Sequence, residues 1–599
     1  MRRALCIAPA LLLAACGGSG GGPAALPQPR SSPAAKDVTV TAKITIPGAG
    51  STSNRALKKI YDTASTTQGI LLTVYPVSGT SAQAVTVTGG DISAASSSCT
   101  AVANGRTCTI AFAAPPGSGN QLLAQTYTQI VPASGTVPVG ASVLAAGTTP
   151  ISISTTPASG VNTVNLTLNP VLASVNITPI PSSLRALLPA TFGVSVVGLD
   201  ASGSIIVAGQ YVDVNGNPVS AALSLGSNPN NSLSLSTSTV NGSGTTVTGT
   251  YNGNDDVAGN ASASIAITSA APFAATGTLT MHGPTVTPMA SAQPYLAGTP
   301  PPYANALFVN VSGSDPQIWY TGAGSGTTCL ANYDVASANG ACATASPGPA
   351  GLSTDGSTYV YAAGSSAPFY YQFNPLGFLG QNNSCTTFCG SSGGSAYSPT
   401  TSSLYYLDNS TGDTVVMMNP TGSGNGAQAS SAALGGTPEA VQVVNVDGID
   451  SAWYLSSTRL FVESGGSGIL ASSPPSGMLD MYLATGGNSA YVTVPASNAI
   501  PVFSGSAPLS ISQSYSTTQG APQYLVGSSD GNSVWFSETT ASGIGIGRID
   551  VVNQRLNESQ IATGGGIAGG IALNPNSDAI YILEWSGTAS PGHIYQVTP

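Results

Sequence analysis

The sequence predicts an all-β protein in which two immunoglobulin-like β-sandwiches precede a seven-bladed β-propeller. Three observations predict this class. A short apolar motif recurs seven times, every 38 to 48 residues, between Ala304 and the C-terminus. The repeats contain no long helical period, and the region before them alternates apolar and polar residues with a period of two. Units of about this length with four short strands each are typical of propeller blades.

The repeated motif is a short apolar strand, and most copies contain an aromatic residue. The seven copies are Ile318–Tyr320, Tyr359–Tyr361, Leu404–Tyr406, Ala452–Tyr454, Ala490–Val492, Val534–Phe536 and Ile580–Ile582. Asp-Gly pairs at 355–356, 447–448 and 530–531 indicate hairpins, because glycine adopts a positive φ without a Cβ clash. A single blade cannot bury both of its faces, so we expect the seven units to close into a ring.

The sixth unit carries a family resemblance. Asp530-Gly531-Asn532-Ser533-Val534-Trp535-Phe536-Ser537-Glu538, followed by Ile546-Gly547-Arg548-Ile549, resembles the streptogramin (virginiamycin B) lyase-like and NHL-repeat propellers. The resemblance covers region 304–599 and implies a propeller with a funnel along its axis. It also implies a metal-assisted lyase that depends on histidine. No histidine lies between His282 and His593, so those histidines have no counterpart here.

The N-terminus predicts export and lipid anchoring. Met1-Arg2-Arg3 is basic, and the apolar stretch Ala4–Ala15 is too short to span a bilayer. Leu13-Ala14-Ala15-Cys16 resembles a bacterial lipobox. We therefore expect residues 1–15 to be a lipoprotein signal peptide and Cys16 to carry acyl chains such as palmitate. Gly17 follows Cys16 in place of an aspartate, which favours the outer membrane or cell surface. The alternative is an ordinary signal peptide with an unmodified Cys16.

Composition shifts divide the rest of the chain. Residues 16–36 are rich in Gly, Pro, Ser and Ala and predict a flexible tether. Alternating runs predict one immunoglobulin-like sandwich over 37–168 and another over 169–283. The proline-rich stretch 284–303 predicts a hinge, or alternatively a first strand that closes the ring. The propeller follows over 304–599.

Charge restricts the class of partner. The chain has 13 Lys and Arg against 23 Asp and Glu, a net charge of −10. Nucleic-acid binding needs clustered cations, so we predict no nucleic-acid partner. The expected partners are the membrane, through Cys16, and an unidentified protein, glycan or small molecule.

Six cysteines remain beyond Cys6 and Cys16, and they fall into near-neighbour pairs. The pairs are Cys99 with Cys108, Cys329 with Cys342, and Cys385 with Cys389. An even number of cysteines in an exported protein predicts disulfides. A metal site at Cys385 and Cys389 is the alternative, although no further Cys pair or His follows to complete a tetrahedron.

Three carboxylates are the candidate ligand or metal residues. Glu538 and Glu584 occupy the same position in units six and seven, at the end of the second strand, and Asp408 takes it in unit three. Around one mouth of a ring they could hold a divalent cation or a cationic ligand, because oxygen ligands suit hard ions. The alternative is a solvated rim that only aids solubility. We predict no other cofactor and assign no catalytic residue.

Other motifs have structural interpretations. Trp319, Trp453 and Trp535 predict packing between blades, with sugar stacking as the alternative. Asn252–Asp256 could bind calcium but lacks the spacing of an EF-hand, which favours a polar loop. Gly527-Ser528-Ser529-Asp530-Gly531 has the letters of a nucleophile elbow but lies on a hairpin.

The sequence favours a binding or scaffold lipoprotein. The propeller presents a wide, rigid face for a ligand or protein, and the sandwiches act as spacers. The alternative is a metal-assisted lyase or hydrolase of the streptogramin lyase-like type. A surface-layer component that self-associates is a third possibility.

Overall fold

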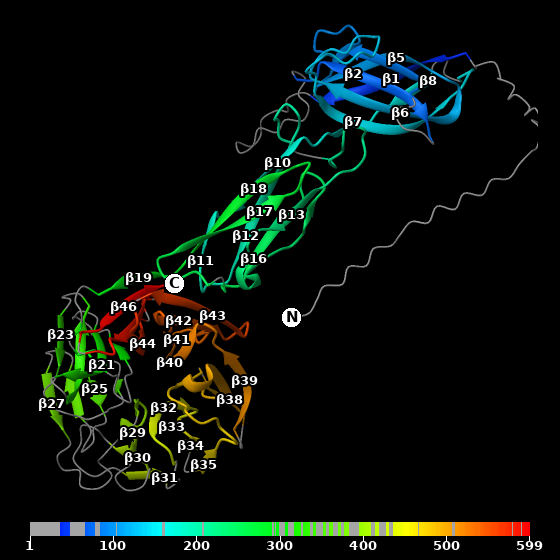
Figure 1. Ribbon diagram of the computed structural model, residues 1–599. Coiled ribbons are helices and arrows are strands. Elements are labelled where there is room, and N and C mark those ends of the chain that lie inside the picture. Colours follow the sequence, from blue (N-terminus) through cyan, green and yellow to red (C-terminus); the bar gives the residue numbers. More distant parts are fainter. Residues whose placement is uncertain are drawn as a thin grey trace, which may run out of the picture. The chain divides into compact units, whose positions relative to one another are not determined.

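The computed structural model describes residues 36–599 apart from several internal stretches, of which the longer are 48–65, 299–305, 310–316, 343–351, 382–393 and 419–426. The described residues form strands β1 to β46 and two short 3-10 helices, η2 (Pro229–Asn231) and η3 (Pro495–Ser497). No helix in this described part is long and apolar enough to cross a membrane. The predicted all-β class is confirmed (Figure 1).

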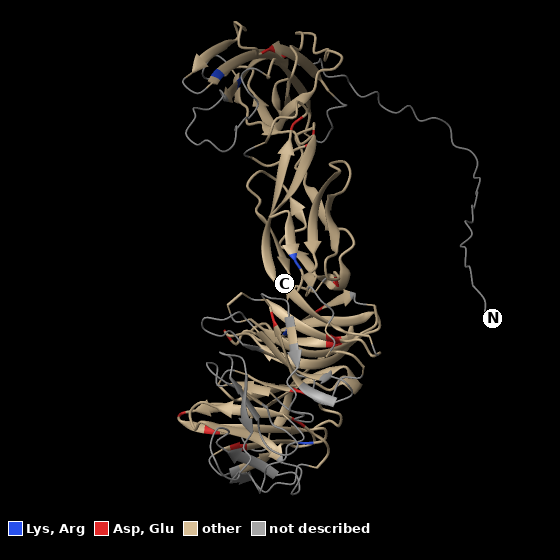
Figure 2. Ribbon diagram, turned by 90° about the vertical axis from the view of Figure 1, so that its left-hand side faces the viewer, with Lys and Arg blue, Asp and Glu red and all other residues tan. Residues whose placement is uncertain are grey.

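Two compact units divide the chain. One contains the first sandwich, and the other contains the second sandwich together with the propeller. Charged residues are sparse in both units (Figure 2), as expected for a chain with only 6% charged residues.

The first sandwich packs two sheets around one core, with strand orders β4-β5-β1-β8 and β3-β2-β6-β7-β9. Its strands are β1 (Val38–Pro47), β2 (Gly69–Pro76), β3 (Thr86–Asp91), β4 (Cys99–Val102), β5 (Gly105–Ala114), β6 (Gly117–Tyr127), β7 (Val143–Ile153), β8 (Asn162–Asn165) and β9 (Asn169–Pro170). Alternation along β1 buries Val40, Ala42, Ile44 and Ile46, because successive side chains of a strand point to opposite faces.

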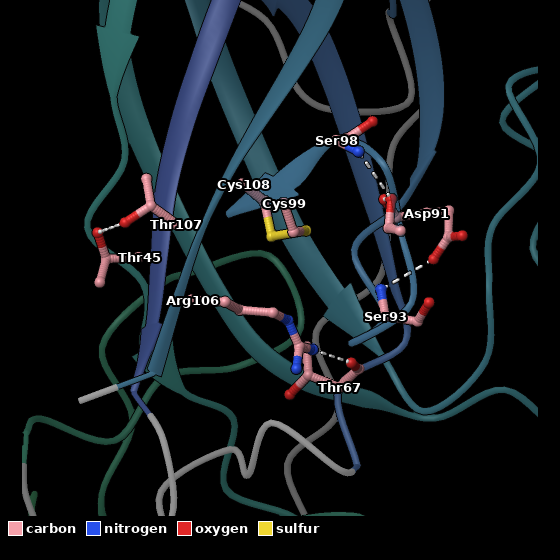
Figure 3. Close-up of a disulfide and its surroundings, with 10 residues drawn as sticks. Thr45, Thr67, Asp91, Ser93, Ser98, Cys99, Arg106, Thr107 and Cys108 are labelled. Carbon is pink, nitrogen blue, oxygen red and sulfur yellow. Dashed lines mark hydrogen bonds between the residues drawn. A yellow bond between two sulfur atoms is a disulfide. The ribbon is translucent and has the colours of Figure 1, made fainter. Parts of the chain in front are cut away.

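A disulfide joins Cys99 of β4 to Cys108 of β5 (Figure 3). The two residues lie directly opposite each other in the antiparallel register, with their Cα atoms 4.0 Å apart. Cys108 is fully buried in the core of the sandwich. The side chains of the other four candidate cysteines lie outside the described residues, so those two pairings stay predictions: Cys329 with Cys342, and Cys385 with Cys389.

The second sandwich has strand orders β10-β12-β16-β14 and β11-β18-β17-β13-β15. Its strands are β10 (Ser174–Ile180), β11 (Ser183–Arg185), β12 (Ala190–Leu199), β13 (Ala221–Leu225), β14 (Leu233–Leu235), β15 (Thr239–Val240), β16 (Val247–Tyr251), β17 (Ser262–Ser269) and β18 (Ala275–His282). Tyr211 and Tyr251 are fully buried in its core. The region contains no cysteine, so apolar packing takes the place of a covalent link.

Seven four-stranded antiparallel sheets make up the propeller, and we number them as blades one to seven. Blade one has β20 (Ala306–Val309), β21 (Gln317–Gly324), β22 (Thr327–Asp334) and β23 (Asn339–Cys342); blade two has β24 (Leu352–Thr354), β25 (Tyr359–Ala362), β26 (Phe369–Gln372) and β27 (Gly377–Gln381). Blade three has β28 (Ser395–Ser398), β29 (Ser403–Asp408), β30 (Thr414–Met418) and β31 (Ala427–Ser430); blade four has β32 (Pro438–Val446), β33 (Ile449–Ser456), β34 (Leu460–Ser464) and β35 (Ser467–Leu470). Blade five has β36 (Met481–Leu483), β37 (Ser489–Val492), β38 (Ala499–Ser504) and β39 (Ser510–Ser516); blade six has β40 (Gly520–Gly527), β41 (Ser533–Thr540), β42 (Gly543–Asp550) and β43 (Arg555–Ala562). Blade seven has β44 (Ile567–Leu573), β45 (Ile580–Trp585), β46 (His593–Thr598) and the earlier strand β19 (Thr285–Pro288).

The ring is closed in two ways. The first strand of each blade contacts the first strands of both neighbours, and β44 of blade seven contacts β20 of blade one. In addition, β19 pairs with β46 and so completes the last blade with a strand from before the first one. Figure 1 shows the blades following one another around this ring. Closure removes the free edges that an open sheet would expose.

The recurring aromatic residues lie on the second strands and are buried. Trp319, Trp453 and Trp535 are 3%, 3% and 6% exposed. Their rings fill the space between neighbouring sheets, and none presents an open face on which a sugar ring could stack.

Candidate functional site

Two of the predicted rim carboxylates lie inside the blades. Glu538 on β41 is 0% exposed and Glu584 on β45 is 4% exposed. They do occupy equivalent strand positions, but the expectation of an open mouth needs correction. Each second strand lies between the first and third strands of its own sheet, and the neighbouring blades cover its faces. The side chain of Asp408 lies outside the described residues.

Glu538 and Glu584 have different partners. Glu584 accepts a hydrogen bond from the Tyr595 hydroxyl (3.1 Å), and the Nδ1 atom of His593 lies 3.3 Å from the same carboxylate oxygen. Glu538 instead faces Glu558 on β43. Within the described residues, no group of three or more His, Cys, Asp or Glu side chains could hold a metal ion. The structure therefore does not bring these two glutamates into one metal site.

A different pair of carboxylates lines the axis of the propeller. A cavity of about 30 Å³ lies among the first strands of blades two to six, with room for about two water molecules. Its lining residues are Leu352, Gly394, Ser395, Glu439, Ala440, Val441, Gln442, Leu479, Asp480 and Tyr524. Glu439 and Asp480 are the ionisable carboxylates of this set, which we call the axial pair.

A β-bulge places Glu439 in the cavity. On β32, Pro438 pairs with Ser456 and Ala440 pairs with Leu455, so Glu439 is an extra residue with no cross-strand partner. Bulges bend a strand and redirect a side chain. The first strands of blades six and seven have irregularities at similar places, between Pro522 and Leu525 and between Ala568 and Ile571.

Backbone hydrogen bonds fix Asp480, which directly precedes β36. The Leu525 amide of blade six donates to its Oδ2 atom at 2.7 Å, and the Met481 amide also donates to its carboxylate. The backbone amide of Asp480 is bonded to the Thr493 hydroxyl at 3.0 Å. Asp480 therefore links the inner strands of blades five and six.

Both carboxyls of the axial pair keep their protons to unusually high pH. Burial, together with the nearby charge of Asp480, raises the pKa of Glu439 to about 8. Burial also raises the pKa of Asp480 to about 7, against the opposing effect of its two amide hydrogen bonds. Groups that gain or lose a proton near neutrality can bind cations in exchange for protons or act as a general acid and base.

Two local features of the sequence distinguish the axial pair. Glu439 is one of only five glutamates after the leader, and Asp480 stands directly before the apolar run Met481–Leu483. Inner strands line the axis of a propeller, so acidic residues at the start of a unit's first strand are the ones to inspect. The recurring aromatic motif instead marks the second strand, which lies in the middle of each sheet.

A larger cleft, of about 430 Å³, lies between blades six and seven and the second sandwich. The Arg548 guanidinium lies over the Trp535 ring, 5.8 Å from its centroid, and covers that face. The serine-containing hairpin at 527–531 borders the cleft. Gly527 has a packing role, since a Cβ there would lie 1.9 Å from the Tyr482 ring.

The remaining predicted sites have simpler outcomes. Asp256, in the candidate calcium loop, accepts hydrogen bonds from Gln519 and Asn230. Cys16 lies outside the described residues.

Comparisons with known proteins identify no family. No protein-family model matches the chain, and no curated protein matches it. Among solved structures, it is similar to the RRP9 WD40 repeats, at 9% identity over 52% of this chain and 97% of that one, with a TM-score of 0.39. It is also similar to PpgL, the periplasmic gluconolactonase of Pseudomonas aeruginosa, at 15% identity over 49% of this chain and 99% of that one, with a TM-score of 0.32. The Myceliophteria thermophila Cps50 (Swd1) β-propeller domain shares 12% identity over 47% of this chain and 93% of that one, with a TM-score of 0.36. These likenesses are distant, so the fold assignment rests on the chain's own strand pairing: the C-terminal half is a β-propeller.

Proposed function

We propose that the protein is a membrane-anchored, extracytoplasmic binding or scaffold lipoprotein whose propeller binds a cationic ligand at the axial pair. The anchor is an acylated Cys16 in the outer membrane or at the cell surface, and residues 16–36 form the tether. The two sandwiches act as spacers. The leader, the lipobox and the low content of charged residues support this location.

The observation that carries the ligand class is the axial pair itself. Glu439 and Asp480 are the ionisable carboxylates among the lining residues, and no lining residue is Lys, Arg or His. A small cation fits the cavity of about 30 Å³, and the amino group of a lysine side chain or polyamine has that size and charge. Because the pKa values of both carboxyls lie near neutrality, binding of a cation there displaces protons.

Calorimetric titration tests this assignment. Spermidine, cadaverine and CaCl₂ are the probes, each in two buffers with different ionisation enthalpies at pH 7.5. We expect one probe to bind with proton release, and Asp480→Asn and Glu439→Gln to weaken it at least tenfold. Asp447→Asn is the matched control, since Asp447 is exposed on a hairpin of blade four. Equal binding by Asp480→Asn and wild type would disprove an axial site.

An acid–base enzyme is the second candidate. The raised pKa values of Glu439, about 8, and Asp480, about 7, supply two groups that gain and lose protons near neutrality, as general acid–base catalysis needs. A lyase or hydrolase of this kind would show a bell-shaped pH profile that Glu439→Gln and Asp480→Asn abolish. Binding of a cationic probe without turnover would favour the binding protein.

Metabolic labelling tests the anchor. In cells fed radiolabelled palmitate, we expect the full chain to be labelled and to fractionate with membranes. Cys16→Ser is expected to lose both properties. Labelling that survives this substitution would place the acyl group elsewhere.

A further inference from the structure

A second acidic pair is sealed inside blade six, away from the axial cavity. Glu538 on β41 is 0% exposed and Glu558 on β43 is 5% exposed. The strand between them, β42, places Gly545 opposite Glu538 and Gly547 opposite Glu558. Gly545 and Gly547 are two residues apart on β42, so Glu538 and Glu558 project from the same face of the sheet. A Cβ at Gly545 would lie 3.5 Å from the Glu538 Cβ, whereas the Phe536 ring fills the space at Gly547.

Hydrogen bonds show which member of the pair holds a proton. Glu558 accepts bonds from the Thr518 amide (2.9 and 3.1 Å), the Thr518 hydroxyl (2.8 Å) and the Gln519 amide (3.3 Å). An acceptor with this many donors is a carboxylate. Neither oxygen of Glu538 receives a bond from a donor of the described residues. Two buried carboxylates cannot bond each other, so the Glu538 carboxyl is protonated and donates to Glu558. Burial, together with the Glu558 charge, accordingly raises the pKa of Glu538 well above its usual range.

The loop that Glu558 holds also contacts the second sandwich. Gln519 Nε2 donates to Asp256 Oδ1 at 2.9 Å, and Gln519 Oε1 accepts a bond from Gln560 Nε2 at 2.7 Å. The Gly259 amide donates to the Gln560 carbonyl at 2.8 Å. The Ser559 hydroxyl, next to Glu558 on β43, donates to the Val257 carbonyl at 2.8 Å. The pair therefore lies directly behind the junction between propeller and sandwich.

We propose that Glu538 and Glu558 form a pH-sensitive latch that, while they share one proton, holds residues 517–519 and the second sandwich against blade six. At alkaline pH a solvent base removes the proton, and two adjacent carboxylates remain in a dry site. Their repulsion is relieved when the loop opens and water enters. Loop opening releases Gln519, and with it the hydrogen bonds to Asp256 and Gln560.

Few other charged groups face the pair. Strand β40 contributes only Tyr524 as a titratable residue, and β44 contributes none. On β42, Arg548 and Asp550 are the charged residues, and they lie near the end of the strand away from Gly545. The Arg548 side chain contacts Trp535 and Asp550 on the opposite face of the sheet from Glu538. From the second sandwich, the facing charged group is Asp256, and another carboxylate cannot offset the repulsion.

Hydrogen exchange of the full chain between pH 6 and pH 10 tests the latch, after correction for intrinsic exchange rates. The reporters are the amides of Thr518, Gln519 and Gly259. The Val551 amide, which donates to the Asn532 carbonyl in the same blade, is the internal reference. We expect the protection of the three reporters to fall as pH rises, by up to about tenfold per pH unit, and to level off above the pKa of the closed pair, as the loss of one proton requires. Protection of Val551 is expected to change much less.

Two variants identify the group responsible. Glu538→Gln keeps a donor toward Glu558 but cannot ionise, so the alkaline loss of protection is expected to disappear. Glu584→Gln is the matched control from the same position in blade seven and is expected to keep it. If Glu538→Gln does not fold, Glu558→Gln removes the repulsion from the other side and is expected to behave alike. An unchanged alkaline loss in the folded variant, or no loss in wild type, overturns the proposal.

Discussion

The axial pair and the buried pair of blade six place two acidic groups close together in the same propeller, with opposite consequences. Glu439 and Asp480 line a cavity and have raised pKa values that still lie near neutrality. Glu538 and Glu558 lie in a sealed site where a ring of donors stabilises one charge and a shared proton removes the other. Access to water makes the difference. An acidic pair that can reach solvent can exchange its protons for a ligand. A sealed pair can only stabilise the closed loop while it is protonated, or destabilise that loop once it is fully ionised.

The largest expected effect is on the sealed pair. Glu558→Ala leaves the Thr518 and Gln519 amides and the Glu538 carboxyl without their acceptor, so we expect a loss of about 3–5 kcal/mol in the free energy of unfolding. All four tryptophans lie in the propeller, so tryptophan fluorescence during urea unfolding reports this region. Glu439→Ala, in the half-buried axial pair, is the comparison and is expected to cost less than about 1 kcal/mol. Equal losses would remove the distinction between the pairs.

The pH dependence of stability is the second expected effect. Unfolded carboxyls lose their protons near pH 4, whereas Asp480 and Glu439 keep theirs in the folded state to about pH 7 and 8. Between these values the folded state binds more protons, so stability falls as pH rises, by at most about 1.4 kcal/mol per pH unit for each group. Urea midpoints from pH 4.5 to 8.5 measure this slope. Glu439→Gln and Asp480→Asn are expected to make this pH dependence weaker below pH 8. A free energy of unfolding that rises with pH in wild type would contradict the assignment.

A smaller expected effect is that Glu439→Gln changes the stability of the ligand-free protein and its affinity for cations in opposite directions. At pH 8.5 we expect Glu439→Gln to raise the free energy of unfolding by about 1 kcal/mol, because it removes a carboxyl that is mostly ionised at this pH although burial disfavours its charge. The same variant is expected to weaken cation binding. Thermal melting with and without spermidine measures both changes. Destabilisation at pH 8.5 would instead indicate that Glu439 stabilises the inner strands as a charged group.

The smallest effect is expected at the link to the second sandwich. Gln519→Ala removes the hydrogen bonds to Asp256 and Gln560 but leaves Glu538 and Glu558 in place, so we expect a loss of about 0.5–1.5 kcal/mol. The alkaline loss of protection at Thr518 is expected to persist. Differential scanning calorimetry together with hydrogen exchange measures both quantities. If the pH response at Thr518 disappears in this variant, Gln519 and not the carboxyl pair would be responsible for it.

The strand content could be predicted because strand periodicity and turn residues are local signals. The apolar alternation of Val38–Pro47 and the Asp530-Gly531 turn each act within a few residues, and both are found as expected. The seven-fold repeat predicted seven sheets for the same reason, since each unit specifies its own hairpins. The Cys99–Cys108 disulfide could also be predicted from the sequence, because the two cysteines flank one hairpin.

The candidate site was less predictable because it depends on which strand of each blade is innermost. Glu538 and Glu584 share a sequence position, but the position is buried, and only the packing of neighbouring blades decides that. Glu439 and Asp480 are 41 residues apart and meet because adjacent blades place their first strands side by side. A bulge at Glu439, which no short sequence pattern signals, directs that side chain to the axis.

The amino-acid sequence by itself determined the strands, the hairpins and their seven-fold recurrence, because these depend on neighbours along the chain. Only the tertiary structure decided which carboxyls share a cavity with room for water and which share a proton out of reach of solvent. The pKa of a carboxyl follows the dielectric and the charges around it, and both are set by residues that are distant in sequence and adjacent in space.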